Sequence, residues 1–146
     1  MKQNRLLPVV IVVIALNLVG CYDVMVNSQL SLVNRSGRAV SILYSNGTQT
    51  PISENNVAYF TSDYQIAQPD SVIYITTLGN NNAWHKYIEE SKTKTLSFYI
   101  FETDTLKKYN DVYSMDNLIK QHKYFKLLCY SENELKKTNW KIVLNK

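Results

Sequence analysis

The strongest nucleophile in the sequence is the thiol of Cys21, and its surroundings point to one kind of reaction. A charged start with Lys2 and Arg5 is followed by an apolar stretch over residues 6–16, and Gly20 directly precedes the cysteine. A charged start, an apolar middle and a small residue before the cut are the parts of a secretory signal peptide, in that order. The apolar stretch is well short of the roughly 20 residues that a membrane-spanning helix needs. We therefore expect residues 1–20 to be removed on export.

The tetrad Leu18-Val19-Gly20-Cys21 resembles the lipobox of bacterial lipoproteins. The resemblance implies that the Cys21 sulfur forms a thioether with a diacylglyceryl group, that the Gly20–Cys21 bond is cut, and that the new amine is acylated. One acyl chain anchors a protein only marginally, whereas two or more anchor it stably. We expect a lipid-anchored protein of the cell envelope, in the outer membrane. The sequence leaves open whether it faces the periplasm or the cell surface.

Removal of the signal peptide leaves 126 of the 146 residues and lowers the formal net charge from +4 to +2. That length suits one domain, which we place at residues 29–146, after a short lipidated tether over residues 21–28. The small net charge and the absence of a basic stripe argue against a nucleic-acid partner. With Cys21 lipidated, Cys129 cannot form an internal disulfide. Its apolar surroundings favour a small core residue.

Short runs of alternating or wholly apolar residues predict a mainly β domain. Eleven tyrosines favour strands, and asparagine clusters favour turns. The apolar run at 96–101 is expected to be a central strand, because it is apolar on both faces. Trp140, Ile142 and Leu144 should face inward from the last strand. The expected strands cover residues 29–33, 39–44, 57–61, 72–76, 96–101, 124–130 and 140–144.

Two or three short helices should accompany the strands. Residues 83–90 can form a turn or two, Asp104 can cap a helix over 105–109, and Ser114 can cap one over 115–121. Ser131 and Glu134 match a capping box. Strands with two apolar faces are buried most simply between two sheets. We therefore predict a single antiparallel β-sandwich, immunoglobulin-like or related.

Three segments of the second half resemble a group of small uncharacterised lipoproteins of gut Gram-negative bacteria. They are residues 96–109, 114–119 and 130–140, which hold an apolar strand, an Asp-Thr-Leu turn, a short helix and an Asn-Trp strand. The resemblance covers about residues 70–146. The chain departs from the group at Ser114-Met115, where the group often has Ser-Trp, and in lacking a proline after the last strand. The resemblance implies a location and a fold but no activity.

Catalytic and metal-binding patterns are weak in this sequence. His85 and Glu89 are spaced to share one helix face, but two ligands do not make a zinc site. His122 lies between lysines and reads as a solvated helix end. Neither a nucleophile elbow, a phosphate loop nor an EF-hand loop occurs. We expect no cofactor and no enzymatic activity.

Two weaker patterns concern carbohydrate. Trp84 and Tyr87 lie beside the Asn80-Asn81-Asn82 turn, and exposed rings flanked by amides can stack on a sugar, although core burial is the commoner fate of such rings. Ser71 and Thr105 each lie in an Asp-Ser/Thr-apolar triplet, which resembles an O-glycosylation motif of some of these bacteria.

Two functional hypotheses follow. The favoured one is a non-enzymatic binding or structural module that holds a glycan or a partner protein near the envelope. The alternative is an envelope hydrolase of unfamiliar type. An acid-base mechanism needs two titratable groups held together in a cleft, whereas strands offer a rigid scaffold on which loops can bind.

Overall fold

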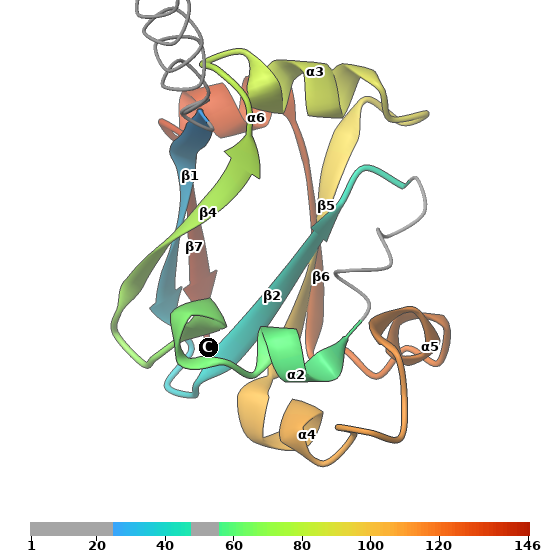
Figure 1. Ribbon diagram of the computed structural model, residues 1–146. Helices are drawn as coiled ribbons and strands as arrows, with labels where there is room; N and C mark the ends of the chain where they lie inside the picture. Colours follow the sequence, from blue (N-terminus) through green and yellow to red (C-terminus); the bar gives the residue numbers. More distant parts are fainter. Residues whose placement is uncertain (1–24, 48–55) are drawn as a thin grey trace, which may run out of the picture.

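The computed structural model describes residues 25–47 and 56–146, which form a mainly β domain. In this part of the chain, seven strands form two sheets, and five short α-helices and one 3-10 turn lie at their ends (Figure 1). The mainly β class is therefore confirmed, while the described part contains more helices than the two or three expected.

The first sheet has three strands in the order β4-β1-β7, with bounds β1 Val26–Arg35, β4 Val72–Leu78 and β7 Lys141–Asn145. Strand β4 runs antiparallel to β1, but β7 runs parallel to it. This parallel pair departs from the wholly antiparallel arrangement that we expected. Strand β1 also begins at Val26, within the segment expected to be a tether.

The second sheet has four antiparallel strands in the order β3-β2-β5-β6. The strand at 96–101 is central, as predicted, because β5 pairs with β2 on one side and β6 on the other. The bounds are β2 Val40–Ser45, β3 Ile66–Ala67, β5 Thr95–Glu102 and β6 Lys126–Ser131.

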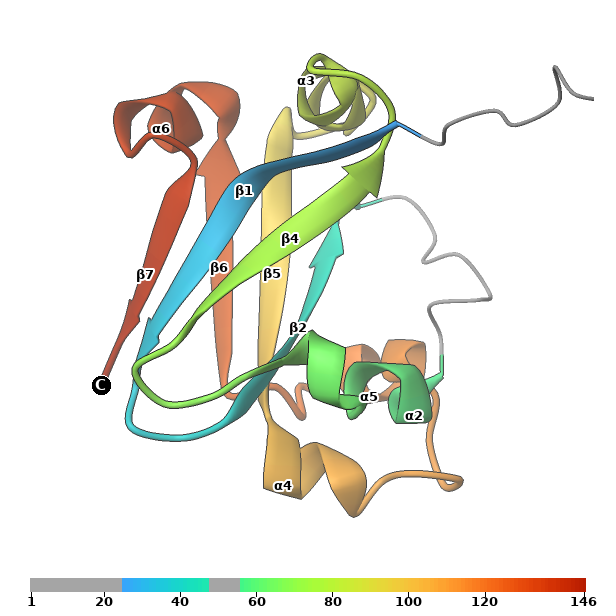
Figure 2. The ribbon, with the colours of Figure 1, turned by 60° about the vertical axis from the view of Figure 1, so that its left-hand side comes forward.

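One hydrophobic core takes residues from both sheets. Leu30, Leu32 and Ile142 come from the first sheet, and Phe98 and Ile100 come from the second. Figure 2 shows the first sheet in front of the second. Trp140, Ile142 and Leu144 are all buried, which confirms the inward face predicted for the last strand.

Four of the five helices lie where local signals placed them. Helix α3 (Ala83–Glu89) covers the expected segment, and the side chain of Ser114 caps α5 (Met115–Lys120) as predicted. Ser131 and Glu134 form the predicted capping box of α6 (Glu132–Lys137). Helix α4 (Thr103–Lys107) begins one residue before Asp104, so Asp104 lies in its first turn and is not its cap.

The strand predicted at 57–61 is wrong, because the chain there forms helix α2 (Val57–Phe60), followed by the 3-10 turn Asp63–Gln65. The Asn56 side chain caps α2 by accepting from the Ala58 amide. Helical spacing turns Val57 and Phe60 to the same side, where both are buried. Packing on the second sheet therefore outweighs the strand preference of the segment.

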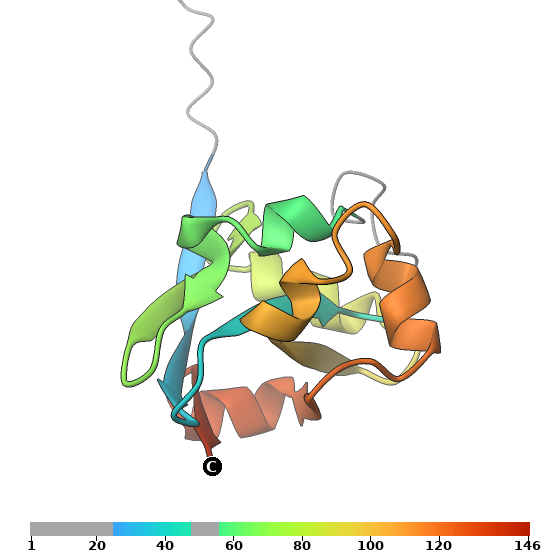
Figure 3. The ribbon, with the colours of Figure 1, turned by 90° about the horizontal axis from the view of Figure 1, so that it is seen from below.

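A second apolar cluster lies between the second sheet and three helices. Leu43 of β2 and Phe101 of β5 meet α2, α4 and α5 there. These helices gather at the end of the molecule opposite α3 and α6 (Figures 1 and 2), and Figure 3 shows them from that end. Side chains alternate along a strand, so Leu43 and Phe101 project from the faces of β2 and β5 opposite to those that join the main core.

Candidate functional site

A groove of about 360 Å³ lies where the two sheets separate, between β4 and the segment formed by β2, α2 and the 3-10 turn. This volume is within the range of small-ligand sites, which is about 300–1,000 Å³. Strand β4 contributes every residue from Ile73 to Leu78. The groove therefore runs along the edge of β4.

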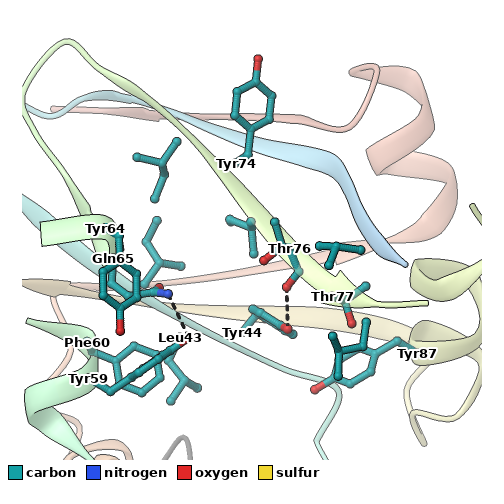
Figure 4. Close-up of a pocket in the computed structure, with 15 residues that line it drawn as sticks. Leu43, Tyr44, Tyr59, Phe60, Tyr64, Gln65, Tyr74, Thr76, Thr77 and Tyr87 are labelled. Carbon is teal, nitrogen blue, oxygen red and sulfur yellow. Dashed lines mark hydrogen bonds between the residues drawn. The ribbon is translucent and has the colours of Figure 1, made fainter. Parts of the chain in front are cut away.

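Tyrosines dominate the lining of the groove. Tyr59 and Tyr64 stand at one end, Tyr44 and Tyr87 at the other, and Tyr74 points away from the cavity (Figure 4). The rings meet edge to face, with centroids 5.6 Å apart for Tyr44 and Tyr87 and 5.9 Å apart for Tyr59 and Tyr64. Edge-to-face pairs add stability beyond burial, so these contacts hold the tyrosine rings in position.

Hydrogen bonds fix two of these side chains. The Tyr44 hydroxyl donates to the Thr76 carbonyl at 3.0 Å and so joins the two sheets. The Gln65 amide donates to the Tyr59 hydroxyl, also at 3.0 Å. One hydrogen bond thus links the β2 side chain to the β4 backbone, and the other links the side chains of α2 and the 3-10 turn.

None of the residues lining the groove carries a charge at neutral pH. The lining offers hydroxyl, amide and backbone groups but neither a carboxylate nor a histidine. Among the residues that the structure describes, no three His, Cys, Asp or Glu side chains cluster as metal ligands. The groove is therefore suited to binding an uncharged ligand by shape, aromatic contact and hydrogen bonding.

The two residues predicted to stack on a sugar have different surroundings. Trp84 is 0% exposed and lies in the core, with its ring centroid 5.1 Å from that of Tyr44. Its indole has no face open to a ligand, so Trp84 does not meet the condition for stacking on a sugar. Tyr87 is half-buried and lines the groove. Trp84 thus supports the groove from behind.

Cys129 corrects another expectation, because it is exposed rather than part of the core. Leu128 and Tyr130 of β6 pack against the core, and side chains alternate along a strand. Cys129 therefore projects from the opposite face, where its thiol lies 3.5 Å from the Ser97 hydroxyl.

His85 belongs to an ionisable network that joins helices α3 and α6. His85 Nδ1 lies 2.9 Å from a Glu132 carboxylate oxygen, and Lys136 Nζ lies 2.7 Å from the other oxygen. The hydrogen bonds from Lys136 and then His85 hold the pKa of Glu132 below its usual value. Glu89 instead pairs with Lys94 at 3.3 Å. His85 and Glu89 therefore serve separate surface contacts.

The remaining predicted positions are placed as follows. Cys21 lies outside the described residues. Ser71 is half-buried, and its hydroxyl donates to the Gln68 carbonyl at 2.7 Å. Thr105 is half-buried in α4, with its hydroxyl 3.4 Å from a Glu102 carboxylate oxygen. His122 is exposed after α5, with Nδ1 3.0 Å from the Tyr124 hydroxyl.

Sequence reasoning missed the groove, although it singled out Tyr87. Tyr59, Tyr64 and Gln65 reach it only because residues 57–60 and 63–65 are helical, whereas the sequence predicts a strand at 57–61. Asn56 was the available signal, since asparagine is a strong helix cap.

The fold and the groove define the chain as a mainly β protein with a groove that is lined by tyrosines and carries no charged side chain. Comparison with protein-family models, with curated proteins and with solved structures finds no match. No helix in the described part of the chain is both long enough and apolar enough to cross a membrane.

Proposed function

We propose that the protein is a lipoprotein of the cell envelope, anchored in the outer membrane through Cys21, and that it acts as a non-enzymatic binding module. The observation that carries the binding role is the tyrosine-lined groove beside β4, which contains no charged side chain. Such a surface can hold a ligand, and it offers no histidine, carboxylate or lysine, the groups that most often serve as a general acid or base. We infer that the groove is the binding site.

The exposed apolar residues at one end of the domain support the anchoring proposal. Met25 is 67% exposed, Val26 52% and Leu78 74%, and the Gly79 amide donates to the Met25 carbonyl at 2.8 Å. The chain enters β1 at this end, beside α3 (Figure 2). Met25 lies four positions after Cys21, where the proposed lipid is attached, a span of at most about 14 Å. This end would then face the lipid.

Replacing Cys21 by serine is expected to abolish anchoring. The serine hydroxyl is too weak a nucleophile to accept the diacylglyceryl group, so the variant should keep residues 1–20 and lack the lipid. Intact mass and detergent phase partitioning measure both effects. Cys129→Ser is the matched control, because this exposed thiol lies far along the chain from the lipobox, and it should mature and partition as the native chain does. Normal maturation of the Cys21 variant would overturn the anchor.

The alternative of an envelope hydrolase is less well supported. The network of His85, Glu132 and Lys136 lies outside the groove, and Lys136 and His85 already engage both oxygens of the carboxylate. A hydrolase would need two titratable groups facing one bound substrate. We therefore rank binding above hydrolysis.

Photocross-linking in cells tests the binding role. A photoreactive residue replaces Tyr64, which is 69% exposed on the rim of the groove, and the control replaces Val112, which is 65% exposed between α4 and α5. We expect a defined adduct with an envelope protein or glycan from position 64 and none from position 112. The absence of any adduct, together with turnover of envelope substrates that one side-chain change abolishes, would establish the hydrolase instead.

Two finer proposals accompany this function. We propose that the two sheets form a β-sandwich, immunoglobulin-like or related, with the parallel β1–β7 pair as its main departure. The support is the core that both sheets share. We also propose O-glycosylation at Ser71 and Thr105, which lie in turns or short helices and retain partial exposure.

A further inference from the structure

We propose that the ligand of the groove is an extended, uncharged polypeptide segment that adds as a strand to the open edge of β4. This inference rests on the groove being the binding site, and it names the chemical class of the ligand. Strand addition combines backbone hydrogen bonds along a sheet edge with contacts to alternate side chains.

The backbone groups along the open edge of β4 can be assigned from the hydrogen bonds. The Asn34 amide of β1 donates to the Ser71 carbonyl, and the Gly79 amide donates to the Met25 carbonyl. The backbone N–H and C=O groups of the odd-numbered residues along β4 therefore point toward β1. The Thr76 carbonyl accepts from the Tyr44 hydroxyl of the other sheet, so the backbone N–H and C=O groups of the even-numbered residues point toward the groove. Residues two apart on a strand direct their backbone groups to the same side. The amides and carbonyls of Val72 and Tyr74 therefore face outward.

Apart from the Tyr44 hydroxyl that occupies the Thr76 carbonyl, this edge carries no residue that usually blocks pairing. Exposed edges are commonly protected by lysine, by proline or by being very short. Strand β4 has seven residues and contains no charged residue and no proline. Among the other edge strands, β7 carries Lys141, β6 carries Lys126 and β3 has only two residues. Strand β4 is therefore the edge most open to a partner strand.

The lining of the groove favours a peptide over a sugar. It has no charged side chain, and the amide of Gln65 is engaged by Tyr59. Trp84 is buried, so its indole offers no face on which a sugar could stack. A strand with uncharged side chains instead meets apolar residues of β2 and α2 on one face and the β4 backbone at its edge.

A peptide that copies residues 26–34, which contain no charged side chain, is a suitable probe. This sequence already pairs with β4 along its other edge, and it alternates Leu30 and Leu32 with Ser31 and Val33. The purified full-length protein in mild detergent is titrated with the end-blocked peptide, while amide exchange at Tyr74 and tyrosine fluorescence are recorded. We expect saturable binding and slower exchange of the Tyr74 amide.

Two substitutions of Tyr74 distinguish the contribution of its backbone amide from that of its side chain. Tyr74 is 70% exposed and points away from the cavity (Figure 4). Tyr74→Pro removes the outward amide without breaking the pairing to β1, since proline is tolerated on an edge strand whose N–H faces outward. Tyr74→Ala removes the same side chain and keeps the amide. The proline variant should weaken the peptide Kd about tenfold, and the alanine variant should change it less than about twofold.

N-methylation of the probe gives a second readout. Two peptides are compared, one N-methylated at its odd-numbered residues and one at its even-numbered residues. Each pattern blocks the hydrogen bonds of one peptide edge, so one peptide should fail to bind and the other should bind as the unmodified peptide does. Equal binding of the two methylated peptides, equal binding by the proline and alanine variants, or no binding would overturn the inference.

A dimer that Tyr74→Pro disrupts, without peptide binding, would show that a second copy occupies the edge. A glycan adduct from position 64 with no peptide binding would refute this inference and retain the binding function.

Discussion

Replacing Asn34 by alanine is expected to lower the free energy of unfolding by about 3 kcal/mol. Asn34 is 0% exposed, and its amide nitrogen donates to the carbonyls of Arg38, Ala67 and Gln68 at 2.8, 2.9 and 3.1 Å. Its carbonyl oxygen accepts from the Ser36 amide and hydroxyl. The alanine variant leaves these buried groups without partners, and each unsatisfied group costs about 1–3 kcal/mol.

Urea unfolding followed by circular dichroism measures this effect. Asn145→Ala is the control, because Asn145 is an exposed asparagine opposite Arg35 on the neighbouring strand, and its loss should matter by less than about 0.5 kcal/mol. Asn34→Asp keeps the shape but turns a carboxylate oxygen toward the three carbonyls, so it should be at least as damaging at neutral pH. Equal stability of the Asn34 and Asn145 alanine variants would contradict the network.

Replacing Trp84 by alanine should cost about 4 kcal/mol, which is typical of removing a buried tryptophan. The ring is fully buried and packs edge to face on both Tyr44 and Tyr87. These tyrosines line the groove. The alanine variant should therefore weaken peptide binding as well as stability, because it leaves a cavity directly behind them.

Trp84→Phe is the matched comparison. The indole nitrogen is buried without a hydrogen-bond partner in the structure, so phenylalanine removes volume but breaks no hydrogen bond. We expect a loss of about 1–2 kcal/mol, well below that of the alanine variant. Thermal or urea unfolding compares the two. If phenylalanine were as damaging as alanine, the indole N–H would have a partner that stabilises the fold.

Signals that act within a few residues were readable from the sequence. The capping box of Ser131 and Glu134 and the Ser114 cap appeared where predicted, because a cap joins groups only three residues apart. Strand β5 was predicted to be central because it is apolar on both faces, and β2 and β6 flank it. Trp140 is buried as predicted, because it alternates with Ile142 and Leu144 on the inward face of the last strand.

The tertiary structure decided the features that depend on which neighbour covers a given face. Residues 57–60 became helical because Val57 and Phe60 could then pack together against Leu43 and Phe101. Cys129 is exposed because its face of β6 is left open, which the apolar run around it could not reveal.

The groove belongs to the same category. It requires β4 to end the first sheet, α2 to turn its tyrosine toward that edge, and Tyr44 to reach Thr76 across 32 positions of sequence. The sequence by itself determined the periodicity of the strands, the helix caps and the lipobox-like tetrad, because each depends on residues adjacent along the chain. Only the tertiary structure decided which strand edge stays unpaired, because strand pairing depends on which segments, distant in sequence, come to lie side by side.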